Sequence, residues 1–245
     1  MYRILVIGEH CKDNFIYGEV TRIAPEAPAP VFVPGKGVTS NSGMASNVAN
    51  NLRSLDPELK VTLLTQQGVI TKTRFVDNKT NHLIMRLDEG EEDLEEYTGR
   101  LELENYNAIV ISDYNKGFVS KRLIENIAAE HPYVFLDTKK ILGDFCRDVK
   151  FIKINSAEWE KSLPFIDKEI QAKTIVTIGS AGAMYQDEIY PVEKVAVKDQ
   201  AGAGDSFLAG LVYKYVTSRG DIYKSIEFAN ECATKVVMKR GIATI

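Results

Sequence analysis

A glycine-rich turn followed at once by a carboxylate is the segment of this chain most suited to chemistry. Gly202, Ala203 and Gly204 precede Asp205, and apolar residues then recur at helical spacing over 207–216. Such a turn lets backbone N–H groups converge, and the helix N-terminus adds a partial positive charge, so together they could stabilise a phosphoryl group in transfer. Asp205 could cap the helix or take a proton from an attacking hydroxyl. Taken alone, the turn is more typical of an ordinary helix start.

Polar residues also follow several short apolar segments that we predict to be strands. Asp13 comes after 4–7, Ser112 to Gly117 come after 108–111, and Asn155 to Glu158 come after 151–154. Because open α/β sheets bind ligands beyond the carboxyl ends of their strands, these residues are expected along one ligand-binding rim. Asp13 is equally consistent with an ordinary turn aspartate.

Short apolar strands alternate with helical patterns along most of the chain. This rhythm predicts an α/β fold, with a mostly parallel sheet covered by helices on both faces. Antiparallel strand material is expected over 184–197. The expected strands are 4–7, 61–64, 108–111, 134–136, 151–154 and 174–178, and the expected helices include 41–52, 119–129 and 222–237.

Two further pairs of strands are expected outside the main sheet. Residues 15–22 and 31–33 flank a bend with three closely spaced prolines, which forbid helix and favour edge structure. Residues 71–76 and 82–87 are expected to form a hairpin. The acidic run 88–96 that follows is predicted to begin a solvated helix, in preference to a metal site.

The composition limits the classes of function. A chain of 245 residues with 44% hydrophobic residues suits one sizeable domain, predicted to span 1–245. A net charge of −4 gives no general attraction to nucleic acid or membrane, and no apolar run is long enough to cross a bilayer. The three scattered cysteines suggest reduced thiols and a cytoplasmic location, and the three histidines show no metal-ligand spacing.

Three motifs in order resemble those of the ribokinase-like (PfkB) carbohydrate kinases: 43–47 (Gly-Met-Ala-Ser-Asn), 155–158 (Asn-Ser-Ala-Glu) and 201–205 (Ala-Gly-Ala-Gly-Asp). The resemblance spans nearly the whole chain. It implies a three-layer α/β/α fold with a small β-flap made from about 14–36 and 72–87. It also implies an ATP-dependent phosphotransferase with an alcohol group as acceptor.

Further segments are similar to the D-glycero-β-D-manno-heptose-7-phosphate kinases. They are 22–31, 73–74 with 84–88, and 112–117. That family phosphorylates the anomeric hydroxyl on the route to ADP-heptose, and its members stand alone or are fused to an adenylyltransferase. The resemblance also implies a homodimer formed through the flap.

The family roles carry over to matching positions of this chain. Asp205 resembles the catalytic base, and the backbone of Gly202, Ala203 and Gly204 resembles its anion hole. Asn155 and Glu158 resemble the pair that organises Mg²⁺, partly through water, which suits an ion that prefers oxygen ligands. A monovalent cation is left open. The nucleotide side comprises Asn155, Ser156, Ala157, Glu158, Thr177, Gly179, Gly182 and Asn230.

The sugar phosphate is assigned to a separate group of residues. Asp13, Gly43 and Asn47 resemble contacts to sugar hydroxyls, and the rim residue Asp113 is grouped with them. Lys116, with Arg74 or Arg86, is expected at the 7-phosphate, although all three are equally consistent with ordinary surface charges.

Two departures from the family pattern affect the substrate. Met44 stands where the family has a second glycine, so its side chain could reshape the sugar pocket. The chain passes from Leu64 to Thr71 in six residues, where the family usually has a further helix and strand. The alternatives are therefore a kinase for another sugar or a nucleoside, and a non-catalytic nucleotide-binding homologue.

Overall fold

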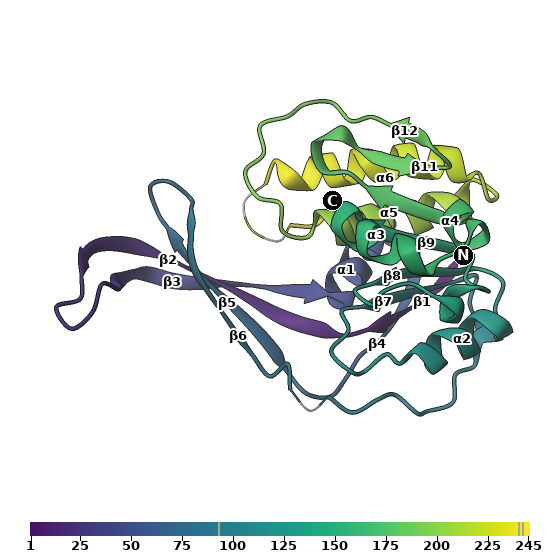
Figure 1. Ribbon diagram of the computed structural model, residues 1–245, viewed down its shortest axis with the longest axis horizontal. Helices are drawn as coiled ribbons and strands as arrows, with labels where there is room; N and C mark the ends of the chain where they lie inside the picture. The colour runs from purple at the N-terminus through teal and green to yellow at the C-terminus, as the bar shows by residue number, and fades with distance from the viewer. Residues whose placement is uncertain (93, 240, 242) are drawn as a thin grey trace.

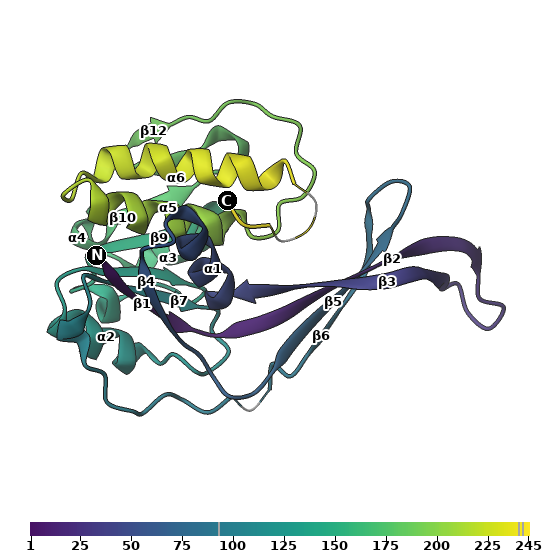
Figure 2. The same cartoon turned by 180° about the vertical axis from the view of Figure 1, so that it is seen from behind.

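Two β-sheets organise the protein, whose computed structural model describes residues 1–92, 94–239, 241 and 243–245. The larger sheet lies inside the body of the molecule, and the smaller one projects away from it (Figure 1 and Figure 2). No helix in the described ranges is long and apolar enough to cross a membrane.

The larger sheet is mostly parallel. Its strands run in the order β12-β11-β10-β9-β8-β7-β1-β4, and all described neighbours are parallel except the pairs β10–β11 and β11–β12. Continuous apolar runs form the central strands because helices bury both of their faces. The bounds are β1 (Arg3–Gly8), β4 (Lys60–Leu64), β7 (Ala108–Asp113), β8 (Val134–Thr138), β9 (Phe151–Asn155), β10 (Thr174–Thr177), β11 (Ala183–Tyr185) and β12 (Glu188–Tyr190).

Helices cover the larger sheet on both faces, which confirms the three-layer prediction. Alternate residues of a strand point to opposite faces, so Ile4 of β1 belongs to one buried core and Leu5 to the other. α1 (Ala45–Leu55), α5 (Ala203–Thr217) and α6 (Ile222–Val237) pack in the first core, and α2 (Lys121–Glu130), α3 (Ser156–Ser162) and α4 (Lys168–Ala172) pack in the second. Short 3₁₀ turns lie at Leu103–Asn105, Asp144–Cys146, Leu163–Phe165 and Gly179–Ala181.

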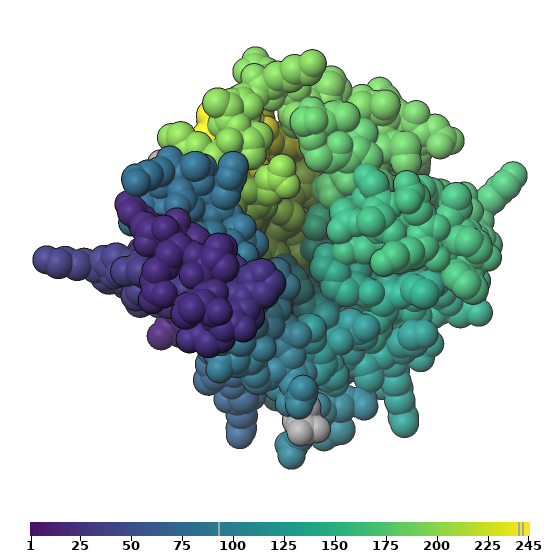
Figure 3. All heavy atoms as spheres, turned by 60° about the vertical axis from the view of Figure 1, so that its left-hand side comes forward, coloured from purple at the N-terminus to yellow at the C-terminus, as the bar shows by residue number. Residues whose placement is uncertain are grey.

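The smaller sheet is the predicted flap. It contains β2 (His10–Ile23), β3 (Pro30–Met44), β5 (Ile70–Asp77) and β6 (Leu83–Glu89), in the order β3-β2-β5-β6. β2 continues the chain directly from β1, and β3 leads directly into α1, so the flap joins the body next to α1 (Figure 1). Figure 3 shows the hollow that lies between the flap and the body.

Three predictions of local structure were wrong. The first helix begins at Ala45, because 41–44 still pair with β2 as the end of β3. The described residues of the acidic run 88–96 contain no helix, since β6 extends to Glu89 and Gly90 turns with φ 72°; Asp93 lies outside the described residues. Antiparallel strand material ends at Tyr190, because Pro191 follows and has no N–H for a strand ladder.

The short connection after β4 leaves that strand at the edge of the larger sheet. The chain leaves β4 at Leu64 and enters β5 of the flap at Ile70. This arrangement is consistent with a family fold that has lost an element beyond β4.

Candidate active site

A cavity of about 830 Å³ lies in the body where β8, β9 and β10 end and α5 begins. It contains the glycine turn and most of the residues predicted for the nucleotide side. Glu158 is the member of that set that does not line it. The predicted residues in its wall are Gly202, Ala203, Gly204, Asp205, Asn155, Ser156, Ala157, Thr177, Gly179, Gly182 and Asn230.

The glycine turn presents the N-terminus of α5 to this cavity. Gly202 has φ 82°, a conformation that favours glycine, and α5 starts at the next residue. Within the described chain no side chain caps this helix, so Asp205 does not serve as its cap. The uncapped helix end provides partial positive charge beside the cavity, as an anion site requires.

Asp205 is buried between two hydrogen-bond donors. Asp205 is 5% exposed, and it lines the cavity. The Asn47 amide donates to Oδ2 at 2.9 Å, and the Tyr114 hydroxyl donates to Oδ1 at 2.8 Å. Burial raises the pKa of Asp205 to about 6, although the two hydrogen bonds act in the opposite direction. A carboxylate with that pKa is suited to accept a proton near neutral pH.

Two lysines from neighbouring strand ends also line the cavity. Lys153 of β9 donates to Asp137 Oδ2 at 2.8 Å, and Lys139 donates to Glu158 Oε1 at 2.6 Å. Although burial opposes it, the charges of Asp137 and Glu158 raise the pKa of Lys139, which therefore stays positive. Sequence reasoning missed both lysines as site residues. For Lys139 the available signal was the run 137–140, which directly follows the strand at 134–136, whereas Lys153 lies inside the strand at 151–154 and gave none.

Asn155 and Glu158 are held by each other. Asn155 caps α3 by accepting from the Glu158 N–H at 3.0 Å, and Glu158 Oε2 accepts from the Asn155 N–H at 2.8 Å. This capping box fixes both side chains at the border of the cavity. Since Lys139 takes the other carboxylate oxygen, direct metal binding by Glu158 would require this pair to open.

The residues fit Mg²⁺ as an ion held mainly by phosphates and water. Among the described residues, no group of three His, Cys, Asp or Glu side chains could hold a metal. One buried carboxylate oxygen beside the cavity, Asp137 Oδ1, lacks a hydrogen-bond partner within the described chain. Mg²⁺ typically takes one or two carboxylates and keeps several waters, so Asp137, together with Glu158 once its pair with Lys139 opens, would hold such an ion.

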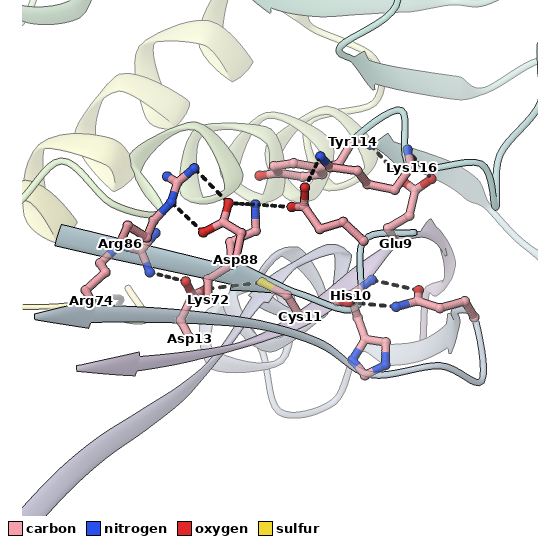
Figure 4. A network of polar contacts seen from close by, with 12 residues as sticks. Glu9, His10, Cys11, Asp13, Lys72, Arg74, Arg86, Asp88, Tyr114 and Lys116 are labelled. Atoms are coloured by element: carbon pink, nitrogen blue, oxygen red, sulfur yellow. Dashed lines mark hydrogen bonds and ion pairs between the residues drawn. The ribbon is translucent and has the colours of Figure 1, made fainter. Parts of the chain in front are cut away.

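The residues predicted for the sugar phosphate lie outside this cavity, mainly on the flap. Asp13 is buried and contacts both the Arg74 guanidinium and the Cys11 thiol (Figure 4). Gly43 lies beside it, because a Cβ there would be 1.9 Å from Asp13 Oδ2. Asp13 is therefore already occupied by partners within the chain.

The other predicted cations are also paired. Arg86 forms two hydrogen bonds with Asp88, at 2.7 and 2.9 Å (Figure 4). Lys116 contacts Glu91. Lys116 lines a second cavity of about 630 Å³ together with residues 88–92 and Asn115. Neither cavity includes Asp113, which is buried and binds the ammonium of Lys140 at 2.8 Å.

Comparison with known proteins decides the family. Residues 71–245 match the model of the pfkB family carbohydrate kinases. The chain belongs to this family. It is therefore a phosphotransferase whose acceptor is an alcohol group. The bifunctional protein HldE of Campylobacter jejuni serotype O:2 is 29% identical over 99% of this chain and 62% of its own length. HldE of Helicobacter pylori strain J99 is also 29% identical, over 99% of this chain and 64% of its own length.

The chain thus spans less than two thirds of these relatives. The Campylobacter alignment has 292 positions against 245 residues here, so it contains gaps in this chain. Solved structures confirm the ribokinase-like fold. Ribokinase from Thermotoga maritima superposes with a TM-score of 0.75 at 13% identity, covering 99% of this chain and 95% of that one. Ribokinase from Cryptococcus neoformans in complex with ADP gives 0.67 at 14% identity, covering 99% and 96%.

Proposed function

We propose that this chain is an ATP-dependent sugar kinase that phosphorylates a hydroxyl of a sugar phosphate, namely O1 of D-glycero-β-D-manno-heptose 7-phosphate. The observation that carries the proposal is the placement of Asp205. Its carboxylate is buried, has a pKa near 6, and lies at the entrance of an uncapped helix facing a cavity with two lysines. The similarity to the HldE proteins and to the heptose-7-phosphate kinase motifs supports this choice of sugar.

In this mechanism Asp205 takes the proton of the sugar hydroxyl as its oxygen attacks the γ-phosphorus of ATP. The bond from that phosphorus to the bridging oxygen breaks, and ADP leaves. The backbone N–H groups at the start of α5 and the Lys153 ammonium stabilise the charge on the transferred group. Mg²⁺, when bound, supplies further neutralisation of the phosphates, with Asp137 and Glu158 as the residues that would hold it.

The flap is proposed to cover the sugar and to form a homodimer. Leu83, Met85 and Leu87 form an apolar stripe along the edge strand β6, and they are 55%, 53% and 44% exposed. Met85 and Leu87 alternate and so share one face, and a bulge in the pairing with β5 separates Leu83 from them. An exposed apolar stripe on an edge strand favours contact with a second copy of the chain. The three buried, unpaired cysteines suit a reducing compartment, and we place the enzyme in the cytoplasm.

A kinase for a smaller sugar is the second candidate, because of Met44. This residue is 3% exposed and packs with Cys11 and Ile70 against the partly buried Tyr114. A side chain at a position where the family has glycine reduces the space on the acceptor side of Asp205.

The test is ADP release with a panel of sugar phosphates, free sugars and nucleosides. We expect turnover with heptose 7-phosphate, and we expect Asp205→Asn to lower it by about 10³-fold or more, since it removes the general base. If the wild type and Asp205→Asn release ADP at equal rates with every acceptor, the proposal that the chain is a sugar kinase is wrong. Turnover restricted to another acceptor would leave the kinase mechanism and replace the substrate.

A further inference from the structure

Tyr114 is the second partner of the base, and it is not among the site residues predicted from the sequence. Its hydroxyl donates to Asp205 Oδ1 at 2.8 Å, while the Asn47 amide donates to Oδ2 at 2.9 Å. Both oxygens of the carboxylate therefore already have a donor. An incoming hydroxyl must replace one of these donors or share its oxygen. Asn47 is buried away from the cavity, whereas Tyr114 lines it, so Tyr114 is the donor that an acceptor meets.

The loop that carries Tyr114 is fixed by the buried carboxylate of Glu9, the residue between β1 and β2. Glu9 is fully buried and accepts from the N–H groups of Tyr114, at 2.8 Å, and Lys116, at 3.2 Å (Figure 4). The loop turns through two residues with positive φ, Asn115 at 56° and Gly117 at 108°. These contacts hold the backbone at Tyr114 in place, and with it the hydroxyl that donates a hydrogen bond to Asp205.

Lys139 holds the other side of the tyrosine. Its ammonium lies 5.4 Å from the centre of the Tyr114 ring while it pairs with Glu158. The ring therefore lies against a lysine of the cavity wall. A movement of the Tyr114 ring would therefore change the surroundings of the Lys139 ammonium, and a movement of Lys139 would change those of the ring.

We propose that Tyr114 is a positioning residue that covers Asp205 until an acceptor binds, and so suppresses phosphoryl transfer to water. The proposal rests on the proposed kinase function. The sugar hydroxyl would displace the Tyr114 hydroxyl from Oδ1 as it takes its place next to the base. A water molecule, which has no further contacts to the site, does not compensate for the loss of that hydrogen bond.

The suppressed reaction is hydrolysis of ATP. With the base uncovered, Asp205 takes a proton from water, the water oxygen bonds to the γ-phosphorus, and the bond to the bridging oxygen breaks. ADP and inorganic phosphate are the products. Exclusion of water from the reacting groups is a general need of kinases, because water is a competing nucleophile.

Tyr114→Phe tests the proposal, since it removes only the hydroxyl. We measure ADP release from Mg·ATP in the absence of any sugar, in the purified full chain. The expected result is an increase of about tenfold over the wild type, the order given by one hydrogen bond to a charged group. Tyr97→Phe is the matched control, because it removes a hydroxyl that donates to the Arg100 carbonyl, away from Asp205, and its rate should equal that of the wild type.

The pH profile separates a positioning role from a structural one. The Tyr114 hydrogen bond lowers the pKa of Asp205, so its removal should move the acid limb of this ADP release to higher pH. The double variant Tyr114→Phe with Asp205→Asn should lose the increase. The proposal is overturned if Tyr114→Phe releases ADP without sugar no faster than the wild type does. This holds provided that the variant unfolds cooperatively at the same temperature as the wild type.

Glu9→Gln provides a second route if Tyr114→Phe does not fold. It weakens the hold on the loop and leaves the tyrosine in place, so a smaller increase in sugar-independent ADP release is expected. If Glu9→Gln shows no increase in sugar-independent ADP release, this result also contradicts the proposal that Tyr114 covers Asp205. Failure of the wild type to phosphorylate any sugar is a separate outcome, which contradicts the kinase proposal and not the role of Tyr114 in covering the base.

Discussion

Gly204 leaves room for the ammonium of Lys153. A Cβ built on residue 204 would lie 2.9 Å from Lys153 Nζ, and the lysine is held in that position by Asp137. The glycine turn and the buried lysine therefore form one anion-binding unit. The last glycine of the motif is needed because of what lies behind it, in addition to its role in the turn.

Gly204→Ala should lower activity much more than stability. The added methyl group displaces the end of a side chain, which can move at a small energetic cost, but the ammonium then leaves its place beside the turn. We expect kcat to fall by about tenfold or more, the scale of one misplaced charge-stabilising group. Gly68→Ala is a suitable control, since a Cβ there makes an ordinary contact of 3.5 Å with Leu94. Equal kcat values for Gly204→Ala and the wild type would contradict this account.

Lys153→Met should damage both folding and catalysis. Lys153 is 4% exposed, and its removal leaves the buried Asp137 carboxylate without its closest cation. Breaking a buried pair typically costs about 3 kcal/mol in the free energy of unfolding. The double variant Lys153→Met with Asp137→Leu should recover most of that free energy, while phosphoryl transfer stays low. Recovery of activity in the double variant would mean that the lysine has only a structural role.

The parallel body of the fold was predictable because its strands are buried on both faces. β1 and β7 are continuous apolar runs, which are visible without any partner. The end of β3 was mistaken for a helix because the flap is exposed over most of its length. The residues taken for helix, 41–44, therefore show no strand alternation, since 41 and 42 are at least partly exposed and 43 and 44 are both buried.

The site was predictable where its signal is local in the chain. The segment 202–205 carries its own turn, helix start and carboxylate. By contrast, Lys153 meets Asp137 only through the register of β8 and β9, in which the two residues are direct neighbours. Tyr114 meets Asp205 across 91 positions of the chain. Such contacts follow from sheet order, which no short motif contains.

Asp205 should set the acid limb of the activity profile. Its pKa is raised from 3.8 to about 6, so we expect kcat/KM to fall below about pH 6 as the base becomes protonated. Because the folded pKa lies above the unfolded one, the native state binds more protons between these values. The free energy of unfolding should therefore fall as pH rises through this window.

Asp205→Asn should remove that dependence. Chemical denaturation at pH 4.5 and pH 7.5 should show a smaller difference for the variant, and at pH 7.5 it should be more stable than the wild type by about 1–3 kcal/mol. The same pH dependence in both proteins would mean that another group is responsible.

The exposed stripe of β6 should determine the oligomeric state. Met85→Lys places a charge in the middle of the stripe, and we expect the proposed dimer to dissociate to monomers in sedimentation velocity. Ile189→Lys, on β12 of the larger sheet, changes an equally exposed residue outside the flap and should have no effect. A wild type that is monomeric at high concentration, or a Met85→Lys variant that remains dimeric, would be inconsistent with dimerisation through this strand.

Met44 should both strain the backbone and restrict the acceptor. Its φ of 57° with ψ of −136° is a conformation that glycine adopts far more easily. Met44→Gly and Met44→Ala both remove the buried side chain, but only glycine also removes the strain. We therefore expect Met44→Gly to be the more stable of the two by about 1 kcal/mol in chemical denaturation. If the side chain limits the acceptor pocket, both variants should lower KM for larger sugar phosphates relative to smaller ones. An unchanged ratio of KM values in both variants would show that Met44 does not limit the size of the acceptor.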